Sequence, residues 1–107
     1  MNLNQNELKA LTRLKTFLQN QESFVDLLVF GSKVLSLSTS ESDIDILIIF
    51  REFDHDLQAL IDDFIFELNL EYDCLMSVVI FSLDELESGP MSESPLYKSA
   101  MQQGIRV

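Results

Sequence analysis

The sequence has little of what secreted, membrane-spanning or nucleic-acid-binding proteins need. Its single cysteine, Cys74, cannot form an internal disulfide, so we expect a reducing, cytoplasmic compartment. No apolar run approaches the ~20 residues of a transmembrane helix, and the N-terminus lacks the charged-then-apolar order of a secretion signal. Only 7 Lys and Arg stand against 18 Asp and Glu, a net charge of −11. Repulsion from phosphate backbones argues against direct nucleic-acid binding, whereas the charge suits a basic protein partner or bound divalent cations.

The composition that remains is typical of a folded protein. Of the 107 residues, 47% are hydrophobic, and there are no repeats, low-complexity segments or internal linkers. A chain of this length can bury one hydrophobic core. We therefore expect a single domain spanning residues 1–107.

Hydrophobic periodicity predicts alternating helices and strands. Apolar residues recur at helical spacing near the N-terminus and most clearly over 57–68, whereas β-branched and apolar runs predict the strands. The expected order is helix 4–20, strand 24–30, short helix and loop 33–42, strand 43–50, helix 57–68, strand 74–82, a helical turn before Gly89, and a helix from Pro95 to Gly104. This order indicates an α/β fold, with a small mixed sheet packed against helices.

Two aspartates stand at the start of the second expected strand, "DIDILIIF". Side chains alternate along a strand, so Asp43 and Asp45 share one face and Ile44 takes the other. Their Cα atoms are then roughly 6–7 Å apart, so both carboxylates can reach one ion or a pair of ions. Unpaired, the two would repel each other, and Mg²⁺ removes that penalty while accepting substrate phosphate as well. We therefore predict that Asp43 and Asp45 bind Mg²⁺.

A Gly-Ser pair closes the first expected strand. Gly31 lets the backbone come close to a ligand, and amide groups at the start of a following helix attract phosphate. Ser32 offers a hydroxyl to the same phosphate, and Lys33 adds positive charge nearby. If the two strands are neighbours, the phosphate-binding turn and the metal-binding aspartates face one cleft.

Gly31-Ser32, ten intervening residues and then Asp43-Ile44-Asp45 give the chain a resemblance to a known superfamily. The pattern is similar to the signature of the nucleotidyltransferases that include DNA polymerase beta. The chain length and the segments "LEYDCLMSVVIFSLDELE" and "SPLYKSAMQQGIRV" further resemble the minimal nucleotidyltransferases, or MNT domains, of bacteria and archaea. This resemblance implies a nucleotidyltransferase fold over nearly the whole chain.

The resemblance also implies roles for individual residues. Gly31, Ser32 and Lys33 would hold the phosphates of ATP, and Asp43 and Asp45 would bind Mg²⁺. An acceptor hydroxyl would attack the α-phosphate and release pyrophosphate, chemistry that relies on positioning and charge neutralisation. The family usually has arginine where this chain has Lys33, and lysine keeps the charge but lacks the forked geometry.

The same resemblance implies a third carboxylate on the neighbouring strand. "CLMSVVIFS" contains none, but Glu71 and Asp73 precede it and could reach the site from the near end of the strand. We take Asp73 as the third catalytic carboxylate, with a solvent-exposed acid as the alternative. Without such a group the general base would be absent.

MNT proteins are frequently encoded beside a HEPN protein (named for higher eukaryotes and prokaryotes nucleotide-binding), and the pair acts as toxin and antitoxin. The resemblance therefore implies an Mg²⁺-dependent antitoxin that transfers AMP from ATP to a hydroxyl of a HEPN-type toxin. The alternative is a decayed module that neutralises its partner by binding alone. Whether the protein forms homo- or hetero-oligomers stays open.

Overall fold

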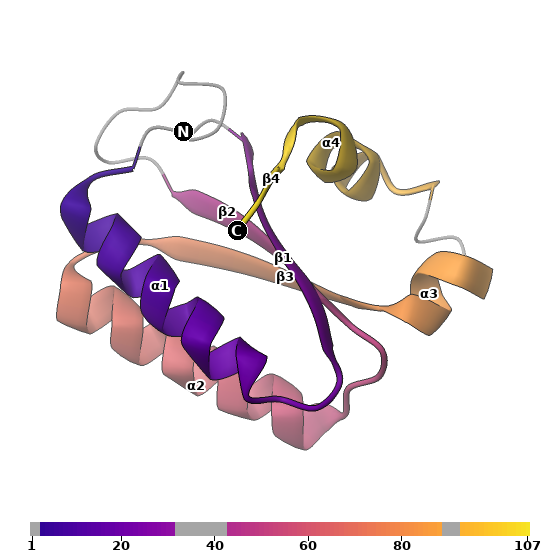
Figure 1. The fold of residues 1–107 in the computed structure, drawn as a ribbon, viewed down its shortest axis with the longest axis horizontal. Coiled ribbons are helices and arrows are strands. Elements are labelled where there is room, and N and C mark those ends of the chain that lie inside the picture. Colours follow the sequence, from indigo (N-terminus) through magenta and orange to yellow (C-terminus); the bar gives the residue numbers. More distant parts are fainter. Residues whose placement is uncertain (1–2, 32–42, 89–92) are drawn as a thin grey trace.

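The computed structural model describes residues 3–31, 43–88 and 93–107, and these residues form a mixed four-stranded sheet of order β3-β2-β1-β4 (Figure 1). The strands are β1 (Phe24–Phe30), β2 (Ile44–Phe50), β3 (Met76–Ser82) and β4 (Ile105–Arg106). β1 runs antiparallel to both β2 and β4, whereas β2 and β3 are parallel. The predicted α/β fold with a small mixed sheet is confirmed.

Four helices surround the sheet in the described part of the chain: α1 (Gln5–Gln19), α2 (His55–Tyr72), α3 (Leu83–Ser88) and α4 (Pro95–Gln103). α1 and α2 lie side by side against one face, and α4 lies by β1 and β4 (Figure 1). α2 is the crossover that two parallel neighbouring strands require. It carries the chain from the end of β2 back to the start of β3, so both strands begin at the same end of the sheet.

The two long helices begin at side-chain caps. At α1 the Asn4 side chain accepts a hydrogen bond from the Glu7 N–H (2.8 Å), and Glu7 Oε1 accepts one from the Asn4 N–H (3.0 Å). At α2 the Asp54 carboxylate accepts from the Leu57 N–H (2.9 Å). The helix that Asp54 caps is longer than the predicted 57–68.

Apolar side chains pack on both faces of the sheet. In β2, Ile44, Ile46 and Ile48 point toward α1 and α2 and are fully buried. Leu47 and Ile49 point the other way, into a second cluster that includes Ala100 of α4 and Phe81. Alternation therefore places Asp45 on the face opposite α1 and α2.

The structure differs from the pattern of apolar residues at several helix positions, and it contains a strand that the sequence did not predict. Leu8 and Leu60 sit at helical spacing but are 46% and 48% exposed, and Leu96 and Met101 are also exposed, leaving Ala100 as the buried residue of α4. β4 was not predicted, because two residues carry no periodic signal. The predicted short helix over 33–42 lies outside the described residues.

Among the helices that the structure describes, none combines the length and the apolar character needed to cross a membrane.

Candidate functional site

Strand pairing brings the two halves of the sequence motif together. β1 and β2 are antiparallel neighbours, and Phe30 at the end of β1 lies opposite Asp45 in β2. Gly31 follows Phe30 directly, so it reaches the Asp45 side chain, and Asp43 immediately precedes β2. Gly31, Asp43 and Asp45 therefore gather at one end of the sheet, as they would if the predicted strands were neighbours.

Gly31 and Asp45 are in direct contact. Gly31 has φ +78°, a left-handed conformation that side chains rarely adopt. A Cβ atom built on Gly31 would overlap Oδ2 of Asp45 and stand 3.2 Å from its Cγ. The backbone conformation therefore favours glycine at this position, and a larger residue would also displace the carboxylate of Asp45.

The two aspartates interact through their charges. The pKa of the Asp45 carboxyl is raised above its ordinary value, first because the group is partly buried and second because of the Asp43 charge. Asp43 itself is exposed. An ionised pair at this place is thus held in an unfavourable state that a nearby positive charge would relieve.

Carboxylate oxygens are the ligands that Mg²⁺ prefers, and the partly buried Asp45 beside the exposed, negatively charged Asp43 fits such an ion. Among the described residues, however, no group of three or more His, Cys, Asp or Glu side chains is arranged to hold a metal ion. An ion held by Asp43 and Asp45 would therefore take further ligands from substrate or water.

The predicted third carboxylate stands elsewhere. Asp73 ends α2 in a left-handed conformation (φ 50°), with an exposed side chain, and its N–H donates to the Asn69 carbonyl. It lies near enough to Cys74 to help raise the pKa of that thiol, although burial is the larger cause. Glu71 forms an ion pair with Arg13 of α1. The structure does not gather Asp73 or Glu71 with Asp43 and Asp45, and the role of Asp73 stays a prediction.

Other predicted residues fall as follows. Ser32 and Lys33 lie outside the described residues, so their contacts with phosphate stay predictions. Cys74 is buried in the hydrophobic core. His55 is exposed and is the first residue of α2.

Strand register places beside Asp45 a residue that the sequence motif does not contain. β3 pairs with β2 so that Ser77 stands beside Asp45, and the Ser77 side chain is exposed. Sequence patterns place both residues in strands but do not contain the register between the strands. Only the pairing reveals that the two are neighbours.

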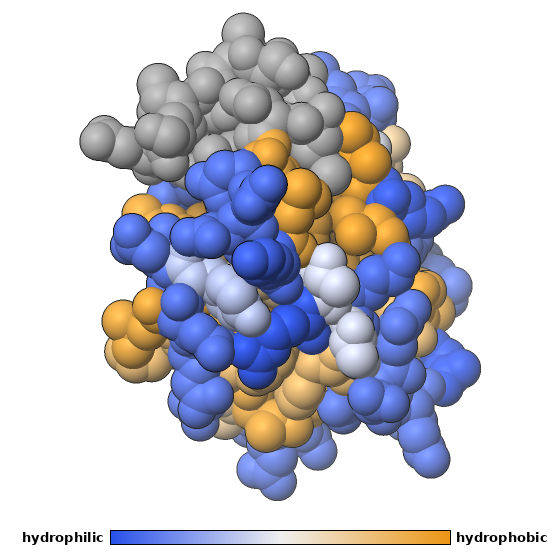
Figure 2. All heavy atoms as spheres, turned by 60° about the vertical axis from the view of Figure 1, so that its left-hand side comes forward, coloured by the Kyte–Doolittle hydropathy of each residue, from blue (hydrophilic) through white to orange (hydrophobic). Residues whose placement is uncertain are grey.

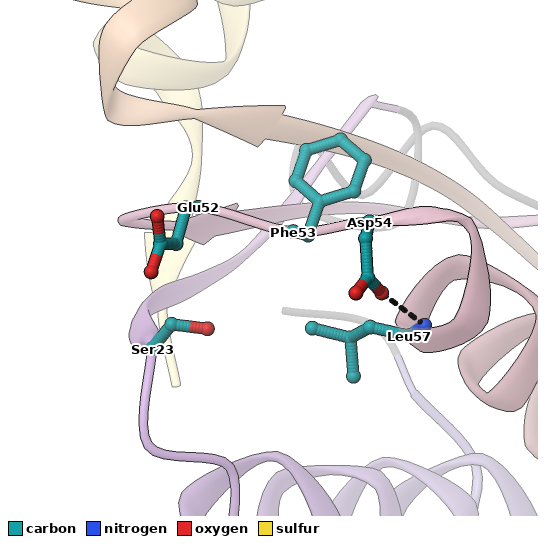
Figure 3. A pocket seen from close by; sticks show the side chains of 5 residues that line it. All are labelled: Ser23, Glu52, Phe53, Asp54 and Leu57. Carbon is teal, nitrogen blue, oxygen red and sulfur yellow. Dashed lines mark hydrogen bonds between the residues drawn. The ribbon is translucent and has the colours of Figure 1, made fainter.

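A cavity of about 440 Å³ lies at the other end of β2, lined by Ser23, Glu52, Phe53, Asp54 and Leu57 (Figure 3). The Asp54 carboxylate there is turned toward the N–H of Leu57, which it caps (Figure 3). The seven residues of β2 separate this cavity from Asp43 by about 20 Å. The cavity is therefore not part of the Gly31–Asp45 site.

The fold and the site define an α/β protein with a glycine turn and paired aspartates at one end of a mixed sheet. The profile of the nucleotidyltransferase domain family matches residues 11–105, most of the chain, and the protein belongs to this family. Among curated proteins, none matches the chain.

Solved structures share the fold at low sequence identity. A protein described as a minimal nucleotidyltransferase is 18% identical, with a TM-score of 0.65, over 100% of this chain and 97% of its own. A toxin–antitoxin structure with AMP-PNP is 19% identical, with a TM-score of 0.62, over 92% of this chain and 69% of the other. A Shewanella oneidensis complex of tri-AMPylated HEPN toxin with MNT antitoxin is 19% identical, with a TM-score of 0.56, over 94% and 70%. At such identities these structures are similar to this chain in fold.

Proposed function

We propose that this chain is an Mg²⁺-dependent nucleotidyltransferase that transfers AMP from ATP to a hydroxyl of a partner protein, and that the partner is a HEPN-type toxin for which this chain is the antitoxin. One observation carries the proposal: Gly31 lies against Asp45, beside Asp43, at the end of a nucleotidyltransferase sheet. The solved complexes with AMP-PNP and with an AMPylated HEPN toxin support the choice of nucleotide and partner.

In this proposal Asp43 and Asp45 hold Mg²⁺, and Gly31, Ser32 and Lys33 hold the ATP phosphates. When bound, the ion neutralises phosphate charge and lowers the pKa of the acceptor hydroxyl. The acceptor oxygen bonds to the α-phosphorus as the bond to the bridging oxygen of the β-phosphate breaks, so pyrophosphate leaves. The hydroxyl proton passes to a carboxylate, for which Asp73 is the predicted residue, or to water.

The surface supports a protein acceptor. A net charge of −11 favours encounter with a basic partner. On the face that Figure 2 shows, hydrophilic side chains predominate over smaller hydrophobic areas, in keeping with the acidic composition. We place the protein in the cytoplasm, which supplies ATP and Mg²⁺ and keeps the buried Cys74 reduced.

A second function is favoured by a specific observation: within the described residues, no third acidic group joins Asp43 and Asp45. The chain would then neutralise its partner by binding alone. Such a module would keep the fold and the acidic surface while losing transfer.

Labelled ATP separates the two functions. The protein is incubated with a candidate HEPN-type partner protein, with Mg²⁺ and either α-labelled or γ-labelled ATP. We expect label from the α-position alone to appear on the partner, and the variant Asp43→Asn/Asp45→Asn to abolish it. Neutralisation of the partner without label would support the binding module. Label that persists in the double variant would contradict the assigned site.

A further inference from the structure

Ser77 stands beside the paired aspartates on the same face of the sheet. In β2 and β3, Ile44 pairs with Met76 and Asp45 with Ser77. Ile44 and Met76 are both buried in the cluster under α1 and α2, so the next residues, Asp45 and Ser77, both point to the opposite face. Register partners on neighbouring strands are about 4.8 Å apart, which brings a β3 side chain within reach of the Asp45 carboxylate.

Hydrogen bonds to β2 and to α2 hold the start of β3 in place, and so keep Ser77 beside Asp45. The Ile44 N–H donates to the Leu75 carbonyl (2.8 Å), and the Met76 N–H donates to Oδ1 of Asn69 in α2 (2.9 Å). Other β3 residues on that face lie two positions away, at diagonal distances of about 7–8 Å. Position 77 is therefore the place on β3 from which a side chain joins Asp45 most directly.

The surroundings of Asp45 differ on its two sides, toward β1 and toward β3. On the β1 side the Gly31 backbone fills the space against its carboxylate, and on the β3 side it meets a short, exposed, uncharged residue. A hydroxyl can hydrogen-bond a carboxylate or a metal-bound water but brings no negative charge. Among the residues that the structure describes, the carboxylates gathered around a cation held here without nucleotide would be those of Asp43 and Asp45.

We propose that Ser77 is the third member of the Asp43–Asp45 site, and that its hydroxyl, standing where a third carboxylate would fit, makes cation binding depend on the phosphates of the nucleotide. The inference rests on the proposed function for the cation and the nucleotide. Two carboxylates bind a divalent ion weakly, and the triphosphate oxygens supply the missing charge and ligands. The ion then enters with the nucleotide.

The test introduces a third carboxylate at position 77. Binding of Mn²⁺ alone, without nucleotide, is measured by electron paramagnetic resonance for the wild type, Ser77→Asp and the isosteric, neutral Ser77→Asn. We expect Ser77→Asp to bind Mn²⁺ at least about tenfold more tightly, since affinity rises with the number of charged ligands. Ser77→Asn should stay within about twofold of the wild type. With AMP-PNP present, the advantage of Ser77→Asp should shrink.

Two control variants locate the effect. Gln19→Glu adds one negative charge at the exposed C-terminal end of α1, and should leave Mn²⁺ affinity unchanged. Ser77→Asp combined with Asp45→Asn should lose the gain. The proposal would be overturned if Ser77→Asp bound Mn²⁺ no more tightly than Ser77→Asn does. It would also be overturned if the increase in Mn²⁺ affinity persisted when Asp45→Asn is added.

A measurement on the unsubstituted protein covers the case of a poorly folded variant. Millimolar Mn²⁺ should broaden the Ser77 amide resonance together with that of Asp45, and leave Gln19 sharp. A sharp Ser77 signal beside a broadened Asp45 signal would refute the proposal. If Ser77→Asp binds Mn²⁺ more tightly in a way that depends on Asp45, but the wild type transfers no AMP, the proposed function is contradicted. The role assigned to Ser77 then still holds.

Discussion

At the scale of single residues, Gly31 and Asp45 constrain each other. The backbone at Gly31 has a positive φ, and its missing Cβ leaves the space that Oδ2 of Asp45 occupies. Two separate costs therefore attach to a side chain at position 31, one from the backbone and one from the contact. The two can be measured apart.

Gly31→Ala should lower the free energy of unfolding by about 1–3 kcal/mol, because alanine both resists φ +78° and overlaps Asp45. In an Asp45→Ala background the loss should be smaller by about 1 kcal/mol, since the overlapping oxygen is gone while the backbone cost remains. Denaturant unfolding of the four proteins measures this coupling. Equal losses in both backgrounds would show that the contact contributes nothing.

Asp45 should make stability depend on pH. Its folded pKa is raised, chiefly by burial, so the folded chain holds the proton more tightly than the unfolded chain does. Stability then falls as pH rises from the ordinary pKa through the raised one, and stays lower above it.

In the absence of divalent ions, Asp45→Asn should therefore melt about 1–3 °C above the wild type at neutral pH. At about pH 3, where Asp45 is protonated in both the folded and the unfolded chain, the two proteins should have the same melting temperature. Thermal unfolding followed by circular dichroism measures both. Asp63→Asn, an exposed position on α2, removes the same charge and controls for general repulsion. A wild type as stable as Asp45→Asn at neutral pH would contradict the assigned cause.

At the scale of elements, Asn69 connects α2 to β3. Its Oδ1 accepts from the Met76 N–H (2.9 Å), and its own carbonyl accepts from the N–H groups of Asp73 and Cys74. One residue in the last turn of α2 thus holds both the turn and the first residue of the strand that carries Ser77.

Asn69→Ala should lower stability by about 1–2 kcal/mol, because the Met76 N–H loses its acceptor. Hydrogen exchange at the Met76 amide should accelerate more than tenfold. Asn69→Asp keeps the acceptor oxygen and should retain most of the protection. Unchanged protection of Met76 in the alanine variant would show that the side chain does not hold the strand.

The elements also show what a sequence can predict here. The pattern of apolar residues located α1, α2 and the first three strands: helical periodicity marks the helices, and β-branched and apolar runs that pack on both faces of the sheet mark the strands. It did not foresee that "NLEY" continues α2 to Tyr72, which makes Asp73 a helix cap instead of the approach to a strand. Nor could it supply the register that sets Ser77 beside Asp45, since register is decided by pairing between distant segments.

At the scale of the whole molecule, charge is the dominant feature. The net charge is −11, and the principal extents are 37 × 27 × 17 Å. The Debye length is about 30 Å in 0.01 M salt and about 10 Å in 0.1 M salt. In dilute salt, repulsion among the carboxylates therefore acts across most of the molecule.

Raising NaCl from about 0.01 M to about 0.1 M should raise the melting temperature by about 2–5 °C, because screening relieves this repulsion. Scanning calorimetry at neutral pH measures the shift. At a pH near 4, where many carboxylates carry protons, the same salt step should have a much smaller effect. An equal shift at both pH values would assign the stabilisation to something other than charge repulsion.

The contact between Gly31 and Asp45 has a consequence for the energetics of ligand capture. With the β1 backbone against one side of it, the Asp45 carboxylate has fewer rotamers to choose from even in the free protein. Part of the side-chain entropy that Asp45 would otherwise lose on binding a ligand has then already been lost during folding. The Asp45 carboxylate is thus restricted on one side before anything binds, and affinity gained in this way needs no additional contact.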